Sequence, residues 1–227
     1  MMLFIDDARV AEIRRLCAIY PIDGVTTNPT LLERAGGDPV ATLREIRDVI
    51  GPERLLFAQA IPTDAEGMIR DARALAGLLG PTTVVKLPAV PEGFKAMRAL
   101  LGEGIATCGT VVLTPMQAFL AAKAGAAYAA PYVNRVDDMG YDGVAVTRQT
   151  HDILALHRLP TRVLAASFRN TRQVLELCAH GIAAVTCAPS VIEAFAKSPA
   201  VDAAIDGFSR DFAALAGEGR SMADLIG

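Results

Sequence analysis

The chain has 227 residues, of which 52% are hydrophobic and 21% are charged, so it is long enough to bury one substantial core. Its formal net charge of -3 argues against a nucleic-acid or membrane-surface partner, since both favour basic patches. No apolar run is long enough to span a membrane, and the first residues lack the features of a signal peptide, so we expect a cytoplasmic protein.

Short apolar or β-branched runs alternate with helical stretches along the chain. The helices carry recognisable ends: Gly51-Pro52 stops one of them, and Thr63 with Glu66 is expected to close a capping box at the start of another. Eight strands joined by helices predict a parallel sheet, although this pattern alone fits both a closed barrel and an open sheet. The expected strands are residues 3–7, 24–28, 55–60, 82–88, 107–112, 128–133, 163–167 and 184–187.

Polar residues at the strand ends favour the barrel. In a (β/α)8 barrel such residues converge on the carboxyl-terminal mouth, where the active sites of this fold lie, whereas an open sheet would spread them along an edge. We therefore predict an α/β protein in which residues 1–198 form a (β/α)8 TIM barrel. The polar strand-end residues are Asp6, Asn28, Gln59, Lys86, Thr110, Tyr132 and Ser167.

A further helix is expected after the eighth unit. Ser198-Pro199 is a typical helix start, and an apolar stripe with helical spacing follows it. Residues 199–227 are therefore predicted to be a C-terminal helical extension of the same domain. The stripe can pack on its own barrel or on a neighbouring subunit. It consists of Val201, Ile205, Phe208, Phe212 and Leu215.

The cysteines and histidines have no metal-ligand spacing. Four scattered cysteines form no CxxC pair and the three histidines do not cluster, so we expect reduced thiols and no metal. Because neither a GxGxxG motif nor a P-loop occurs, we expect no nucleotide cofactor.

Lys86 lies in an apolar strand, where burial favours the neutral amine over the ammonium ion. A neutral amine forms an iminium ion with a carbonyl group, and the iminium accepts electrons when a carbon–carbon bond breaks. The alternatives are an ammonium group that reaches solvent or pairs with a carboxylate. The neighbouring polar strand ends favour the Schiff-base role, whereas Lys95, Lys123 and Lys197 are expected to be solvated helix residues.

Two arginines flank the expected mouth. Ser167 and Arg169 belong to the turn after the seventh strand, where barrels often bind phosphate, and a guanidinium can contact phosphate through two hydrogen bonds. Arg135, just beyond the sixth strand, can bind from the other side. Either arginine alone fits a surface charge, but the pair at one mouth predicts a phosphate site.

Four segments are similar to motifs of the transaldolase family, and the resemblance covers nearly the whole chain. The length resembles the small-subunit branch, which includes fructose-6-phosphate aldolases and small transaldolases. Transaldolases generally place a glutamate and a phenylalanine where this chain has Gln59 and Tyr132, which is the fructose-6-phosphate aldolase pattern. The four segments are Gly24–Thr30, Val84–Pro88, Ala130–Arg135 and Leu164–Arg169.

This resemblance implies a catalytic role for several strand-end residues. Lys86 would form the Schiff base, while Gln59, Thr110 and Tyr132 would hold a water molecule. The Tyr132 hydroxyl would act as acid and base, because position 59 carries no carboxylate. The alternative interpretation of Tyr132 is a core aromatic residue with a satisfied hydroxyl.

The resemblance also implies contacts with the sugar hydroxyls. Asp6 and Asn28 would bind the dihydroxyacetone hydroxyls and the iminium region, and Thr26 would be a further substrate-binding residue. Asp7 competes with Asp6 for this assignment, since one of the two carboxylates can cap the following helix. Alternation from Phe4 places Asp6 on the inward face, so Asp6 is preferred.

The implied function is a class I aldolase without a cofactor that reversibly cleaves fructose 6-phosphate to dihydroxyacetone and glyceraldehyde 3-phosphate. One alternative is a transaldolase, which transfers the dihydroxyacetone unit from a ketose phosphate to an aldose phosphate. Another is an inert barrel that binds sugar phosphates. Because relatives form pentamers or decamers through a C-terminal helix, the resemblance also implies a homo-oligomer.

Overall fold

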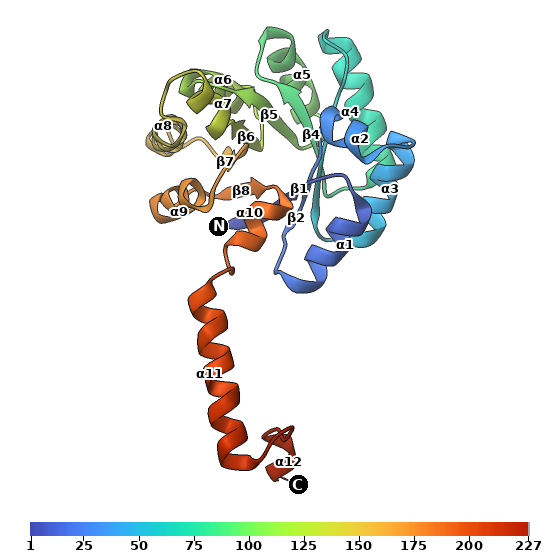
Figure 1. Cartoon of the computed structure of the whole chain (residues 1–227). Coiled ribbons are helices and arrows are strands. Elements are labelled where there is room, and N and C mark those ends of the chain that lie inside the picture. Colours follow the sequence, from blue (N-terminus) through green and yellow to red (C-terminus); the bar gives the residue numbers. More distant parts are fainter. Residues whose placement is uncertain (227) are drawn as a thin grey trace. The chain divides into compact units, whose positions relative to one another are not determined.

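The computed structural model describes residues 1–226, and its first compact unit, Met1–Ile192, is a closed barrel of eight parallel strands in sequential order (Figure 1). Pairing of β1 with β8 closes the barrel. The predicted (β/α)8 architecture is therefore confirmed. The strands are β1 (Met2–Asp6), β2 (Gly24–Thr26), β3 (Leu55–Gln59), β4 (Thr83–Pro88), β5 (Thr107–Val112), β6 (Tyr128–Pro131), β7 (Arg162–Ala165) and β8 (Ala184–Cys187).

Helices connect successive strands and surround the barrel (Figure 1). The outward side chains of the strands, such as Ile5, Val25 and Leu56, are fully buried against this outer layer. The helices that begin in the first unit are α1 (Val10–Ile19), α2 (Pro29–Ala35), α3 (Pro39–Ile50), α4 (Ala65–Leu79), α5 (Pro91–Leu101), α6 (Pro115–Lys123), α7 (Val133–Asp138), α8 (Gly143–Leu156), α9 (Thr171–His180) and α10 (Pro189–Ala194).

Five strands end earlier than predicted, and for β2, β6 and β7 the polar residue therefore lies in the connection that follows. Asn28 is the N-cap of α2, and its side chain accepts a hydrogen bond from the Leu31 amide at 3.0 Å. Tyr132 directly precedes α7, and Ser167 has a left-handed backbone with a φ of 63°. These residues lie outside the named strands because the next helix or turn already begins there, although Tyr132 keeps one parallel bridge to Ala166.

The capping box predicted at Thr63 and Glu66 is wrong. Asp64 is the N-cap of α4, and its carboxylate accepts a hydrogen bond from the Gly67 amide at 2.8 Å. A carboxylate at this position satisfies a free amide and also interacts favourably with the helix dipole.

An apolar layer fills the barrel interior below the carboxyl-terminal mouth. The rings of Phe4, Phe57 and Tyr128 pack edge to face, with centroids 5.2 and 5.1 Å apart, and further apolar side chains complete the cluster. Because side chains alternate along a strand, the residue two positions later points inward one layer nearer the mouth. That next layer contains Asp6, Gln59, Lys86, Thr110 and Thr186.

The second compact unit begins at Glu193 and contains α11 (Pro199–Ala216) and α12 (Ala223–Ile226). The additional C-terminal helix begins as predicted, with Ser198 as its N-cap. The boundary between the two units lies after Ile192, earlier than the boundary predicted after residue 198. The assignment of the C-terminal extension to the same domain stays a prediction. Within residues 1–226, no helix is both long and apolar enough to cross a membrane.

Candidate active site

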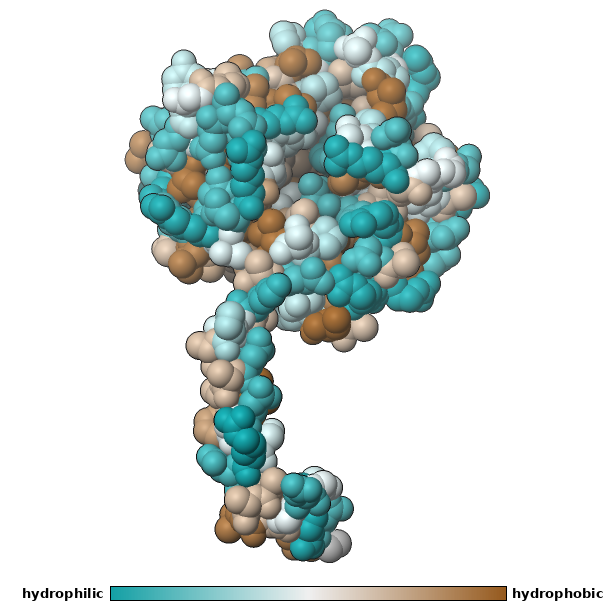
Figure 2. Space-filling model, viewed as in Figure 1, coloured by the Kyte–Doolittle hydropathy of each residue, from teal (hydrophilic) through white to brown (hydrophobic). Residues whose placement is uncertain are grey.

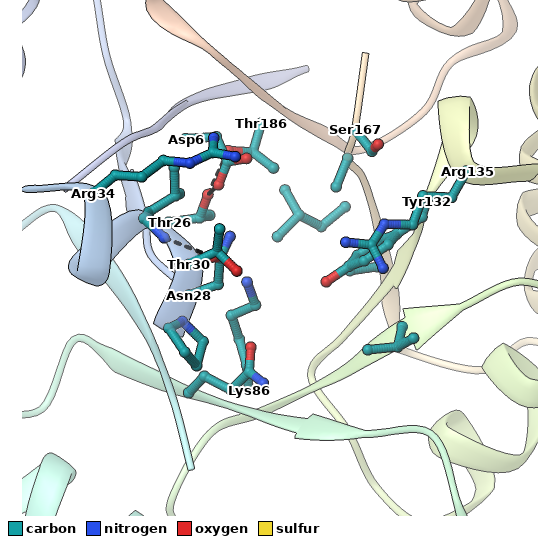
Figure 3. A pocket seen from close by; sticks show the side chains of 17 residues that line it. Asp6, Thr26, Asn28, Thr30, Arg34, Lys86, Tyr132, Arg135, Ser167 and Thr186 are labelled. Atoms are coloured by element: carbon teal, nitrogen blue, oxygen red, sulfur yellow. Dashed lines mark hydrogen bonds between the residues drawn. The ribbon is translucent and has the colours of Figure 1, made fainter. Parts of the chain in front are cut away.

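A cavity of about 450 Å³ opens at the carboxyl-terminal mouth of the barrel. Figure 2 shows this face hollowed near the middle of the barrel, and Figure 3 shows the side chains that surround the cavity. Its size suits a small-molecule ligand. Eight of the predicted site residues line it: Asp6, Thr26, Asn28, Gln59, Lys86, Tyr132, Arg135 and Ser167.

Lys86 reaches the cavity from β4 with only 4% of its surface exposed. Its Nζ donates a hydrogen bond to the main-chain carbonyl of Thr27 at 2.8 Å. No carboxylate within residues 1–226 forms an ion pair with it. The Lys86 side chain therefore neither extends into bulk solvent nor pairs with a carboxylate among these residues, which were the two alternatives that the sequence left open.

The Thr27 carbonyl is itself held by the adjacent strand. The Thr27 amide and hydroxyl both donate to the Phe57 carbonyl, each at 2.9 Å, and Thr27 is fully buried. Because these bonds join the end of β2 to β3, the acceptor of the Lys86 amine is set by the barrel framework.

Asp6 projects into the cavity from the end of β1. The Thr26 hydroxyl donates to Asp6 Oδ1 at 2.7 Å, and the hydroxyls of Thr26 and Thr186 lie 2.6 Å apart. Burial raises the pKa of Asp6, although the Lys86 charge and the Thr26 hydrogen bond both act to lower it. A carboxyl group with a raised pKa is a candidate for proton exchange with a bound substrate.

Asp7, the alternative candidate for this carboxylate, does not line the cavity. Its carboxylate accepts hydrogen bonds from the amides of Ala8 and Arg9, and it forms a 2.6 Å ion pair with the Arg9 side chain. These contacts fix the entry to α1, so the structure places Asp6, and not Asp7, at the cavity.

Tyr132 and Thr110 form a hydroxyl pair beside the cavity. Their oxygens lie 2.9 Å apart, and Thr110 is fully buried behind Tyr132, so Thr110 is not part of the lining. The guanidinium carbon of Arg135 lies 5.2 Å from the centre of the Tyr132 ring. Because Tyr132 also lines the cavity, its hydroxyl is placed where a bound substrate can contact it.

Two lining residues have a strained backbone. Val111 has a φ of 56° and Ser167 a φ of 63°, in the left-handed region that non-glycine residues rarely adopt. At Val111 the register between β5 and β6 shifts. Strain of this kind concentrates at active sites, where the surrounding structure holds it in place.

Arg169, predicted at the phosphate site, does not line the cavity. Its guanidinium forms an ion pair with Asp138 at 2.9 Å. Arg34 of α2 lines the cavity instead, as does Thr186 of β8. Alternation along β8 could have identified Thr186, whereas no strand pattern marked Arg34.

The buried thiols are poor nucleophiles. Burial raises the pKa of Cys108 to about 12 and that of Cys187 to about 12, so both thiols stay protonated near neutral pH. No cluster of three or more potential metal ligands occurs among the described residues.

Three solved structures that resemble this barrel have low sequence identity to the chain. A native KDPGal structure matches 82% of this chain and 81% of its own, with 17% identity and a TM-score of 0.53. Two flavocytochrome b2 structures each match 83% of this chain, with identities of 13% and 14% and TM-scores of 0.58 and 0.59. This chain spans 56% of the flavocytochrome chains. At such identities the likeness shows the fold alone.

Sequence comparison connects the chain to a single enzyme family. Residues 3–224 match the family described as Transaldolase/Fructose-6-phosphate aldolase, which is nearly the whole chain. The match confirms the family predicted from the motifs and, with the barrel fold, indicates an aldolase-type enzyme. The chain therefore belongs to the transaldolase/fructose-6-phosphate aldolase family.

Proposed function

We propose that the chain is a class I aldolase that reversibly cleaves fructose 6-phosphate to dihydroxyacetone and glyceraldehyde 3-phosphate. The observation that carries this proposal is the buried Lys86 amine, which faces the cavity without a carboxylate ion pair among the described residues. Nothing in binding alone requires a buried amine, so this feature argues against an inert sugar-phosphate-binding barrel.

The first half of the reaction forms the Schiff base. Lys86 Nζ attacks the ketone carbon C2 of the sugar, and loss of water gives an iminium ion. The C4 hydroxyl passes its proton to the acid/base group of the site, and the C3–C4 bond breaks; this proton balances the one that C3 takes up later. The bonding electrons move to the iminium nitrogen, so an enamine remains on Lys86 and glyceraldehyde 3-phosphate leaves.

The second half releases dihydroxyacetone. A proton adds to C3 of the enamine, and water hydrolyses the resulting iminium to free the amine. The Tyr132 hydroxyl, paired with Thr110 at 2.9 Å, is assigned the proton transfer, and Gln59 helps to hold the water molecule. Asp6, Thr26 and Asn28 are assigned to the sugar hydroxyls.

The residues at positions 59 and 132 favour an aldolase over a transaldolase. A transaldolase protects its enamine until an aldose phosphate arrives, whereas an aldolase must protonate the enamine and admit water. Tyr132 carries a hydroxyl that phenylalanine lacks, and it lines the cavity. The hydroxyl pair with Thr110 therefore supports the reaction that ends in hydrolysis.

The test is release of glyceraldehyde 3-phosphate from fructose 6-phosphate, measured with and without erythrose 4-phosphate as acceptor. We expect release without the acceptor, and we expect the Lys86→Met variant to lose it. Release that depends on the acceptor would instead identify a transaldolase and would contradict the interpretation of Gln59 and Tyr132.

A further inference from the structure

Arg34 is an unpaired cation at the edge of the cavity. It belongs to α2, lines the cavity and is exposed. Within residues 1–226, it forms neither a hydrogen bond nor an ion pair. Arg135, which is also exposed, contacts only the ring of Tyr132 through its guanidinium. Two guanidinium groups at one cavity thus have no anionic partner among the residues that the structure describes.

The charge of the cavity wall is unbalanced. Two guanidinium groups line the cavity beside the Lys86 amine, and Asp6 is the single acidic side chain among its lining residues. The Asp6 carboxylate accepts the hydrogen bond of Thr26 and feels the charge of Lys86, so it does not neutralise the arginines. Like charges that share a cavity repel each other, and an anionic ligand relieves this repulsion. The two guanidinium groups belong to Arg34 and Arg135.

The two arginines approach from different walls. Figure 3 shows Arg34 on the side of Asp6 and Thr26, and Arg135 on the side of Tyr132 and Ser167, with Lys86 between them. A ketose bound at Lys86 has its C2 atom on the buried amine. Its far end therefore extends toward the mouth, where both guanidinium groups are exposed.

We propose that Arg34 is a specificity-determining residue that, together with Arg135, binds the terminal phosphate of the sugar. Arg34 thereby takes the place that the sequence pattern assigned to Arg169, whose guanidinium is already paired with Asp138. A guanidinium from each side of the mouth suits a phosphate, which accepts several charge-assisted hydrogen bonds at once. The inference rests on the proposed function, because that function supplies the sugar phosphate.

The kinetic test compares Arg34→Leu with Arg169→Leu as a matched control. We expect Arg34→Leu to raise the KM for fructose 6-phosphate roughly 10-fold or more, with little change in kcat, because a charge-assisted phosphate contact is lost. The kcat/KM for unphosphorylated fructose should stay within about twofold of the wild-type value, since its binding lacks that contact. The KM of Arg34→Lys should lie between those of the wild type and Arg34→Leu, since lysine keeps the charge but lacks the planar guanidinium group. Arg169→Leu should leave the KM for fructose 6-phosphate nearly unchanged.

Calorimetry with inorganic phosphate separates this inference from the proposed function. Weaker phosphate binding by Arg34→Leu, in a protein that does not cleave fructose 6-phosphate, would support the role of Arg34 and contradict the proposed reaction. Normal cleavage with an unchanged KM and unchanged phosphate affinity in Arg34→Leu would overturn the inference. A larger loss of phosphate affinity in Arg169→Leu than in Arg34→Leu would overturn the inference as well.

Discussion

The amine of Lys86 is positioned by the main chain of the neighbouring strands. Its acceptor is the Thr27 carbonyl, and Thr27 is in turn bonded twice to the Phe57 carbonyl. Side-chain substitutions around the cavity therefore leave this contact in place. Single substitutions at Asp6 and Tyr132 can be interpreted as changes in chemistry, with the position of Lys86 retained.

Tyr132→Phe tests the proton transfer at the residue scale. The variant keeps the ring beneath Arg135 but loses the hydroxyl that contacts Thr110. We expect kcat for fructose 6-phosphate cleavage to fall by roughly 10²–10⁴-fold, the usual contribution of a positioned acid or base. The Lys86 adduct with dihydroxyacetone should still form. A kcat within about twofold of the wild-type value would remove Tyr132 from this role.

Asp6→Asn tests the carboxyl group at the end of β1. Burial raises the pKa of Asp6 above its ordinary value of 3.8, so the folded protein binds this proton more tightly than the unfolded chain does. The contribution of Asp6 to the free energy of unfolding is largest below pH 3.8, and it is lost as the pH rises through the raised pKa of the folded state. The variant should therefore be more stable than the wild type at pH 7, although less active. Urea unfolding at several pH values measures the difference.

Asp64→Asn is a control for which we expect the opposite change in stability at pH 7. The hydrogen bond from the Gly67 amide lowers the pKa of Asp64, so its carboxylate stabilises the folded state above pH 3.8, and this contribution is lost as the pH falls through the lowered value. We expect this variant to be less stable than the wild type at pH 7. Loss of stability at pH 7 in Asp6→Asn would contradict the raised pKa of Asp6.

At the element scale, the start of α5 packs closely against the end of β4. A methyl group on Gly93 would lie 1.9 Å from the Pro88 carbonyl oxygen, only two residues beyond Lys86. We expect Gly93→Ala to lower the free energy of unfolding by roughly 1–3 kcal/mol, as overpacking does, and to reduce kcat by displacing the end of β4.

Gly77→Ala in α4 provides the matched control. A methyl group there would contact nothing within 4 Å, so the substitution adds helix propensity alone. We expect it to raise the free energy of unfolding by about 0.5–1 kcal/mol. Urea unfolding of both variants checks the pair, and equal effects in the two helices would contradict the close packing at Gly93.

At the scale of the whole molecule, the apolar face of α11 consists mostly of exposed side chains. Val201, Ile205, Phe208 and Leu215 are all at least half exposed, and α11 has no buried residue. We predict that this face forms a homo-oligomer interface. Deletion of the residues after Ser198 should give smaller assemblies in light scattering, as should Phe208→Asp in the full chain. An unchanged mass in both would contradict the prediction.

The strands and their order could be predicted because each carries a local apolar pattern. Thr107–Val112 and Ala184–Cys187 have the predicted bounds, since their patterns end where the sheet ends. The predicted end of β2 is two residues too late because Asn28, which continues the strand pattern, caps α2 in the structure. Helix caps compete with strands for the same residues, and only the folded backbone decides between them.

Most of the cavity could also be predicted, because alternation identifies inward residues such as Asp6, Gln59 and Lys86. The arginines could not. Arg169 is removed from the cavity by Asp138, 31 residues earlier in the chain, and Arg34 reaches it from a short helix. Both outcomes depend on the direction of a long side chain and on a distant partner, which local patterns do not contain.

The most direct test of the central claim is borohydride reduction of the wild-type protein in the presence of dihydroxyacetone, followed by mass spectrometry of its peptides. The account predicts a stable adduct on the peptide that contains Lys86 and its absence in Lys86→Met. No adduct on the wild-type protein, or an adduct on Lys95, Lys123 or Lys197, would contradict it.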